Sequence, residues 1–128
     1  MKRLTISIIL MMAFLTACGG SATTTAPSTV SLPDLEVTDI EEIDDGAKIT
    51  VHNAGTAPAG DFNLHIEISK DTNPAGEFNI KVNGLAAGEE KVIETSFSGT
   101  EHNGIIFTEI DSRNAIVESD EENNEFGF

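Results

Sequence analysis

Alternation of apolar and polar residues constrains the fold of this chain more than any other feature of its sequence. The clearest run spans residues 62–69, where every second residue is apolar: Phe62, Leu64, Ile66 and Ile68. Because successive side chains of a β-strand point to opposite faces of a sheet, this period of two predicts a strand with one buried face. We therefore expect Leu64 and Ile66 to be buried and His65 to lie on the opposite face.

The same alternation, interrupted by turn-forming clusters, predicts seven short strands and no helix. The expected strands cover residues 35–40, 47–53, 62–69, 77–82, 91–97, 105–110 and 115–118. Asp45-Gly46 predicts a tight hairpin between the first two strands, since glycine tolerates a positive φ. Leu85 is a single apolar residue within a cluster of turn residues, and we expect it to close one end of the core. Seven short strands are typical of an all-β, immunoglobulin-like antiparallel β-sandwich, whereas an eight-stranded barrel needs one strand more.

The first 17 residues have the layout of a cleaved secretory signal peptide and not of a transmembrane helix. Lys2 and Arg3 provide a positive start, and the apolar stretch that follows, residues 4–14, is too short to span a bilayer. Small residues then lead to the only cysteine of the chain, Cys18. We expect this leader to be absent from the mature protein.

The residues at the end of the leader, Leu15-Thr16-Ala17-Cys18, resemble the lipobox of bacterial lipoproteins. The resemblance implies cleavage between Ala17 and Cys18 and acylation of Cys18 with chains such as palmitate. It also implies that these acyl chains hold the protein to a membrane of the cell envelope. That membrane would be the outer membrane in a cell with two membranes, and otherwise the outer face of the cell membrane. The alternative is an ordinary secretory signal with an incidental cysteine.

Cleavage of 17 residues from 128 would leave 111, enough for one domain of modest core. Lys2 and Arg3 leave with the leader, so the formal net charge moves from −15 to −17. Such an acidic surface repels phosphate backbones, which excludes nucleic acid as a partner. Residues 18–32 are mostly Gly, Ser, Thr, Ala and Pro and predict a lipidated, disordered tether. Residues 33–128 then form the folded domain.

Four short motifs occur in order along this domain. They are Pro33-Asp34-Leu35, Asn53 to Gly60, Gly84 to Glu89, and a closing stretch that contains Glu118-Ser119-Asp120-Glu121-Glu122-Asn123-Asn124. Together they resemble the CARDB family, the cell adhesion related domain found in bacteria, over residues 33–128. The resemblance implies a sandwich fold and an accessory, adhesion-related role. Two features depart from the family: only Glu125 to Phe128 remain for the strand that often follows the paired asparagines, and Trp and Tyr are absent.

The acidic stretch near the C-terminus offers oxygen atoms of the kind that calcium binds. Its candidate ligands are Asp111, Glu118, Asp120, Glu121, Asn123 and Asn124. Calcium takes about six to eight oxygens from carboxylates, amides and carbonyls, so a weak calcium site is one hypothesis. The alternative is that Asn123 and Asn124 cap a strand end while the acids are solvated. No other cofactor is expected.

Catalysis finds little support in the sequence. His52, His65 and His102 are too far apart in the chain to suggest a ligand pair, and no serine lies in a nucleophile elbow. We therefore expect a non-catalytic, lipid-anchored module that binds an unknown envelope or surface protein in protein–protein interaction or adhesion. A carbohydrate-binding or calcium-binding surface module is the alternative. Carbohydrate binding generally uses exposed aromatics, and the phenylalanines here mostly occupy alternating positions that indicate core packing.

Overall fold

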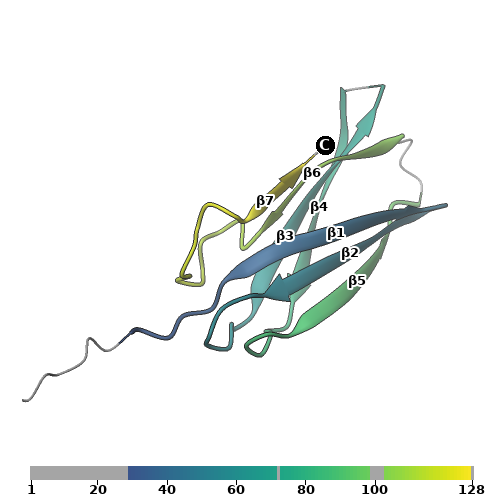
Figure 1. The fold of residues 1–128 in the computed structure, drawn as a ribbon. Helices are drawn as coiled ribbons and strands as arrows, with labels where there is room; N and C mark the ends of the chain where they lie inside the picture. Colours follow the sequence, from purple (N-terminus) through teal and green to yellow (C-terminus); the bar gives the residue numbers. More distant parts are fainter. Residues whose placement is uncertain (1–28, 72, 99–102, 128) are drawn as a thin grey trace, which may run out of the picture.

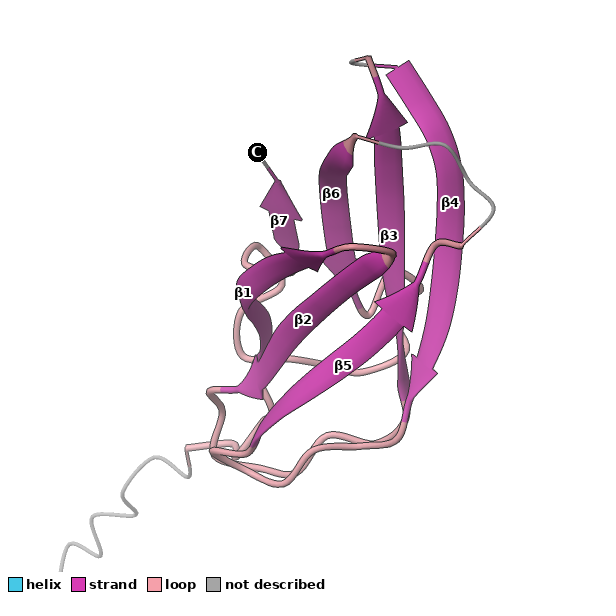
Figure 2. Cartoon of the chain, turned by 90° about the vertical axis from the view of Figure 1, so that its right-hand side faces the viewer, coloured by secondary structure: helices cyan, strands magenta, loops and turns pink. Residues whose placement is uncertain are grey.

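The computed structural model describes residues 29–71, 73–98 and 103–127, which form two antiparallel β-sheets (Figure 1). The strands are β1 (Leu35–Ile43), β2 (Gly46–Asn53), β3 (Phe62–Lys70), β4 (Asn73–Val82), β5 (Glu90–Ser96), β6 (Gly104–Ile110) and β7 (Glu125–Gly127). One sheet has the order β1-β2-β5 and the other the order β4-β3-β6-β7. Figure 2 shows the three-stranded sheet as a separate layer in front of β3 and β6. The expected immunoglobulin-like β-sandwich is confirmed.

The core lies between the two sheets and follows the alternation of the sequence. Leu64 and Ile66 are fully buried, while His65 is only partly buried, on the outer face of β3. Leu85 is 1% exposed and closes one end of the core, as expected. The buried apolar residues are Leu35, Val37, Ala47, Ile49, Val51, Ala59, Phe62, Leu64, Ile66, Ile68, Val82, Leu85, Phe97, Ile105 and Ile110.

The hairpin between β1 and β2 is present, but glycine serves it for a different reason than expected. Ile43 pairs with Gly46, so Asp44 and Asp45 form the turn and Gly46 begins β2. Gly46 does not have a positive φ. A Cβ atom on Gly46 would lie 1.9 Å from the carbonyl oxygen of Thr95 in β5. Glycine is therefore required here because the neighbouring strand approaches closely.

The expected seventh strand at residues 115–118 is wrong: these residues lie in the loop between β6 and β7, and the last strand is Glu125–Gly127. Asp111 and Asn114 have φ angles of 48° and 46°, so the chain turns sharply after β6. The Asp111 carboxylate then accepts the N–H groups of Ala115 and Ile116 at 3.1 and 2.7 Å. These donors are thus engaged locally and do not pair with a neighbouring strand.

Two other strands are longer than the alternation predicts, because residues outside the alternating pattern continue them at the sheet margins. β1 runs on to Ile43, and β4 starts at Asn73 instead of residue 77. β4 contains Pro74, which lacks an N–H donor and is tolerated because β4 is the edge of its sheet.

Candidate functional site

The candidate site is the connection between β6 and β7, residues 111–124, which we call the C-terminal loop. It contains all the acidic residues and amides that were considered as calcium ligands. Two of the acids are buried, Asp111 at 1% and Glu118 at 5% exposed, whereas Asp120, Glu121 and Glu122 are exposed. Buried carboxylates need hydrogen-bond donors, so the partners of these two residues define what the loop does.

Glu118 bonds to groups from two distant parts of the chain. Its Oε2 accepts the backbone N–H of Leu35, at the start of β1. Its Oε1 accepts the Nδ2–H of Asn124 at 3.3 Å. Burial raises the pKa of the Glu118 carboxyl to about 7; these two hydrogen bonds act to lower it, and the charges of Glu121 and Asp111 raise it further. Glu118 is thus a buried carboxyl group that holds the beginning of β1 against the C-terminal loop.

The other candidate ligands are directed toward backbone groups. Glu121 accepts the N–H of Glu118 at 2.9 Å through Oε1, and the exposed Asp120 accepts the N–H of Glu122 at 2.9 Å. The backbone carbonyl of Asn124 accepts the N–H of Ile110 at 2.9 Å, where β6 ends. Of the proposed set, only Glu118, Glu121 and Asn124 are directly bonded to one another. Among the residues described, no group of three His, Cys, Asp or Glu side chains is arranged to hold a metal ion.

Two amide oxygens in the C-terminal loop are buried without a partner. They are Asn123 Oδ1 and Asn124 Oδ1. The nitrogen of each amide is engaged: Asn123 Nδ2 donates to Asp34 Oδ1 at 2.8 Å, and Asn124 Nδ2 donates to Glu118. The loop therefore retains unused acceptor capacity beside its buried carboxyl group.

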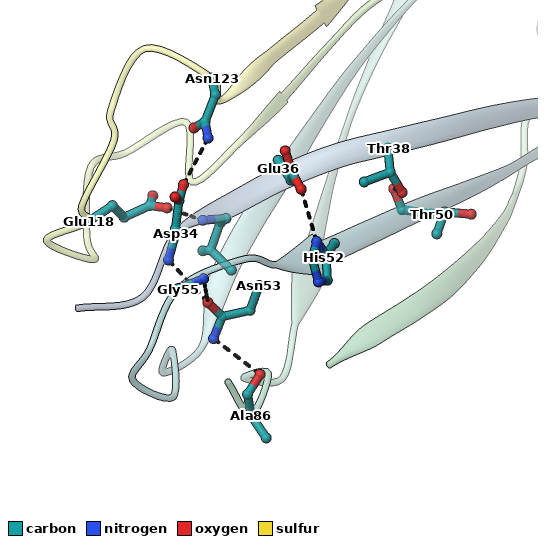
Figure 3. Close-up of polar contacts among 11 residues, drawn as sticks. Asp34, Glu36, Thr38, Thr50, His52, Asn53, Gly55, Ala86, Glu118 and Asn123 are labelled. Atoms are coloured by element: carbon teal, nitrogen blue, oxygen red, sulfur yellow. Dashed lines mark hydrogen bonds and ion pairs between the residues drawn. The ribbon is translucent and has the colours of Figure 1, made fainter. Parts of the chain in front are cut away.

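The C-terminal loop fastens the segment through which the chain enters the domain, residues 31–34, here called the incoming segment (Figure 3). Ser119 N–H donates to the carbonyl of Pro33 at 2.9 Å, and Asn123 bonds to the Asp34 side chain. On its other side, the incoming segment bonds to the loop after β2. The N–H of Thr56 donates to the Leu32 carbonyl at 2.9 Å. The beginning and the end of the domain are thereby bonded together.

Asn53, at the end of β2, organises the same end of the sandwich and is fully buried (Figure 3). Its Oδ1 accepts the N–H groups of Asp34 at 3.0 Å and Gly55 at 3.1 Å. Its Nδ2 lies 2.9 Å from the carbonyl of Ala57 and 3.2 Å from that of Ala86. Asn53, the first residue of one of the four motifs, thus joins the incoming segment to two loops. Its position at a strand end signalled the Gly55 bond, but no local pattern signalled the others.

A hollow of about 560 Å³ lies where the incoming segment meets the loop after β2. Its walls are Thr29, Val30, Ser31, Leu32, Ala54, Gly55, Thr56 and Ser119. Gly55 allows the loop after β2 to lie close to the incoming segment, because a Cβ atom at this position would lie 2.5 Å from backbone atoms of that segment.

The described histidines act singly and on different sheets. His52 Nδ1 lies 2.9 Å from Glu36 Oε1 on the outer face of β2 (Figure 3). His65 Nδ1 lies 3.3 Å from Asn79 Oδ1 on the outer face of β3. Each of these two imidazole rings therefore contacts a side chain on the neighbouring strand. The third histidine, His102, lies outside the described residues.

The expected lipidation site, Cys18, and the cleavage site between Ala17 and Cys18 also lie outside the described residues. So do the signal peptide and most of the tether. In the part of the chain that the structure covers, there is no helix with the length and hydropathy needed to cross a bilayer.

Comparison with known proteins agrees with this architecture. A CARDB family model matches residues 32–128. One similar solved structure is the crystal structure of the CARDB domain of a Pyrococcus furiosus protein in complex with di-metal ions. It is 23% identical to this chain, with a TM-score of 0.57, and the match covers 77% of this chain and 91% of that one. Among curated proteins, none matches this sequence significantly. Because the family match extends over most of the sequence, the chain belongs to the CARDB family.

Proposed function

We propose that the mature protein is a lipid-anchored protein of the cell envelope whose CARDB domain binds another protein. Membership of CARDB, an adhesion-related family of non-enzymatic domains, supports a protein-interaction module. The lipobox-like residues that end at Cys18 support anchoring through acyl chains. The anchor lies in the outer membrane of a cell with two membranes, and otherwise on the outer face of the cell membrane.

The observation that carries this proposal is the way in which the domain is attached to its tether. Ser31 Oγ donates to the Thr56 carbonyl at 2.9 Å, and the C-terminal loop bonds to Pro33 and Asp34. The tether therefore meets the domain at one end, and β1 leads away from that end (Figure 1). A membrane attached through Cys18 would leave the sheet edges and the far turns free for a partner.

The chemistry of the C-terminal loop also supports binding over catalysis. The carboxylates of Asp111, Glu118 and Glu121 accept backbone N–H groups within the domain. A general acid or base needs a carboxyl group that faces a substrate, whereas these groups hold the fold together. The loop therefore serves as a structural fastener.

Calcium binding by Asp111, Glu118, Asp120, Glu121 and Asn124 stays a hypothesis. The di-metal complex of the P. furiosus domain and the two unpartnered amide oxygens are the observations that favour it. The carboxylates fit a metal ion poorly, however, because they point to backbone donors and do not converge on one point. A cation at this loop would have to displace hydrogen bonds that the domain already makes.

Anchoring is tested by replacing Cys18 with serine, which removes the thiol that lipoprotein processing requires. Cys18→Ser should lose acylation and cleavage, as measured by mass spectrometry of the mature N-terminus and by membrane fractionation. Ser21→Ala, which leaves the lipobox-like residues intact, is the matched control and should behave like the wild type. Wild-type protein that is cleaved elsewhere, unacylated and freely soluble would contradict the proposal. Photo-crosslinking from exposed positions of the anchored protein should capture a neighbouring envelope protein.

A further inference from the structure

β5 has a free edge along its whole length. It is the last strand of the β1-β2-β5 sheet, and in Figures 1 and 2 no described strand continues the sheet beyond it. The backbone bonds Phe97 N–H to Asp45 O and Asn53 N–H to Glu89 O show that the odd-numbered residues of β5 face β2. Because alternate residues of a strand direct their N–H and C=O groups to opposite sides, the even-numbered residues face the free edge. These are Glu90, Val92, Glu94 and Ser96.

The other three sheet edges carry features that discourage pairing with another strand. β1 has a register irregularity between Val37 and Asp39, β4 contains Pro74 beside a second irregularity, and β7 has only three residues. Bulges, prolines and short lengths are the usual protections of sheet edges. β5 instead pairs with β2 in unbroken register over all its seven residues, so it is the edge best suited to accept an added strand.

The charges on the outer face of this sheet are unevenly paired. The basic residues of β2 turn toward β1: Lys48 Nζ lies 3.5 Å from Glu41, and His52 Nδ1 lies 2.9 Å from Glu36. On the other side, Glu94 and Glu90 occupy the register positions opposite Lys48 and His52. Within the described chain, neither forms an ion pair.

Between these two acids lies an exposed apolar residue. Val92 is 56% exposed and shares the outer face with Glu90 and Glu94, because all three are even-numbered residues of β5. The edge thus presents an acidic, an apolar and an acidic side chain in a row, together with free backbone donors and acceptors. The side chains directly opposite in an added strand would lie about 4.5–5.5 Å away, which is close enough for ion pairs and apolar contact.

We infer that the free edge of β5 docks an extended segment of a partner protein that carries basic, apolar and basic residues at every second position. This inference rests on the proposed protein-binding function and specifies its surface. The backbone of the segment would continue the sheet, as in other cases of strand addition. Its basic residues would pair with Glu90 and Glu94, and its central apolar residue would cover Val92. The residues between them would face Ile93, which is partly buried on the inner face.

Charge decides against a second copy of this chain as the occupant. The whole sequence has a formal net charge of −15, so two copies repel each other. Two β5 edges would also bring the same acidic side chains together on the outer face, because Lys91, the basic residue of β5, alternates to the other face. A cationic segment removes both penalties.

The direct test titrates the ¹⁵N-labelled full-length protein with the peptide Thr-Lys-Val-Val-Thr-Lys-Thr. Binding should shift the amide resonances of Glu90, Val92 and Glu94 and protect these amides from hydrogen exchange. The amides of Lys91 and Ile93, which already face β2, should change little. The peptide Lys-Lys-Thr-Val-Thr-Val-Thr has the same composition without the spacing and should bind at least tenfold more weakly. Equal binding of the two peptides, or no binding at millimolar concentration, would overturn the inference. Concentration-dependent protection without peptide would overturn it too, in favour of self-association.

A proline at Val92 separates edge docking from folding. Val92 N–H points to the free edge, so Val92→Pro removes a donor for the partner but none for β2, and proline is compatible with an edge strand. We expect peptide affinity to fall at least tenfold while the exchange protection of Lys91 and Ile93 persists. Val92→Thr, which keeps the N–H, should stay within threefold of wild type. Unchanged affinity in Val92→Pro would refute docking at this edge.

Charge reversal gives an independent readout that does not depend on loss of binding. The double variant Glu90→Lys/Glu94→Lys should bind Thr-Glu-Val-Val-Thr-Glu-Thr at least tenfold more tightly than wild type does. Glu77→Lys/Glu125→Lys makes the same change in net charge on exposed positions of the other sheet and should not gain this affinity. Equal gains would mean that net charge alone attracts the peptide. If these peptides fail while crosslinks in the envelope form from other surfaces, the inference is wrong and the proposed function stands.

Discussion

Replacing Glu118 with glutamine should remove a pH dependence of stability that originates at this buried carboxyl group. Its pKa rises from the ordinary value of 4.5 to about 7 in the folded domain, chiefly because the group is buried. The folded chain therefore holds this proton more tightly than the unfolded chain. The resulting stabilisation is complete below about pH 4.5 and is lost as the pH rises through about 7. At about 1.36 kcal/mol per pKa unit, the difference between these limits is about 3 kcal/mol.

Glutamine is a suitable substitute because the neighbouring backbone and amide groups can form hydrogen bonds with its side chain. Its carbonyl oxygen can still accept the Leu35 N–H, and its amide nitrogen replaces the oxygen that faces Asn124. Rotation of the Asn124 amide brings its unpartnered Oδ1 toward this new donor, and no existing acceptor bond of that oxygen is lost. Glu118→Gln should therefore match wild type below about pH 4.5. Near pH 8 it should be more stable by about 3 kcal/mol, or roughly 12–24 °C in Tm.

Thermal or urea unfolding between pH 4.5 and 8 measures this effect as the difference between the two proteins. Glu122→Gln removes the same charge from an exposed neighbour and should show no comparable trend. Glu118→Ala leaves the buried Leu35 N–H without an acceptor and should cost about 1–3 kcal/mol even at pH 5. A wild-type-to-glutamine difference that does not change with pH would refute the assignment of the raised pKa to Glu118.

Three further predictions concern the core, the hairpin and the calcium hypothesis. Ile66→Ala should cost about 2–5 kcal/mol of unfolding free energy in urea titrations, whereas His65→Ala on the outer face should be nearly neutral; equal losses would mean that the register of β3 is wrong. Gly46→Ala should cost at least about 2 kcal/mol, because its Cβ would collide with the Thr95 carbonyl oxygen, and a neutral result would contradict the close approach of β5. Millimolar calcium and sodium at matched ionic strength should give the same Tm. A calcium-specific rise that is lost on removing the carboxylates of the C-terminal loop would establish a cation site instead.

The alternation of apolar and polar residues predicted the strands in which the buried side chains are apolar and the outward-facing ones are polar. β3 was predicted almost to the residue because every inward side chain is apolar and every outward one is polar. The same criterion failed at residues 115–118, where Ile116 and Val117 suggest a strand. The N–H groups of Ala115 and Ile116 donate to the Asp111 carboxylate, and these bonds make the region a loop. A pattern of apolar and polar residues does not predict such bonds.

The candidate site was predictable only as a collection of acids, not as an arrangement. Glu118 and its exposed neighbour Glu122 are indistinguishable in the sequence. Glu118 is buried because a donor from Leu35, 83 residues away, requires an acceptor at that place. Asn53 shows the same limit, since its partners include Ala86, 33 residues away. Contacts of this kind depend on the completed sandwich, so they become visible only with the structure.

The way in which the incoming segment joins β1 has a mechanical consequence. If the tether is fixed to a membrane and a partner holds β5, tension between them has a component parallel to β1, β2 and β5. The hydrogen bonds of an antiparallel sheet lie perpendicular to its strands, so such a pull loads the bonds of the β1–β2 pair, from Leu35↔Asn53 to Ile43↔Gly46, together. Strands loaded in shear resist separation far better than strands peeled apart one bond at a time. Under that loading, the domain would transmit force along its stronger direction.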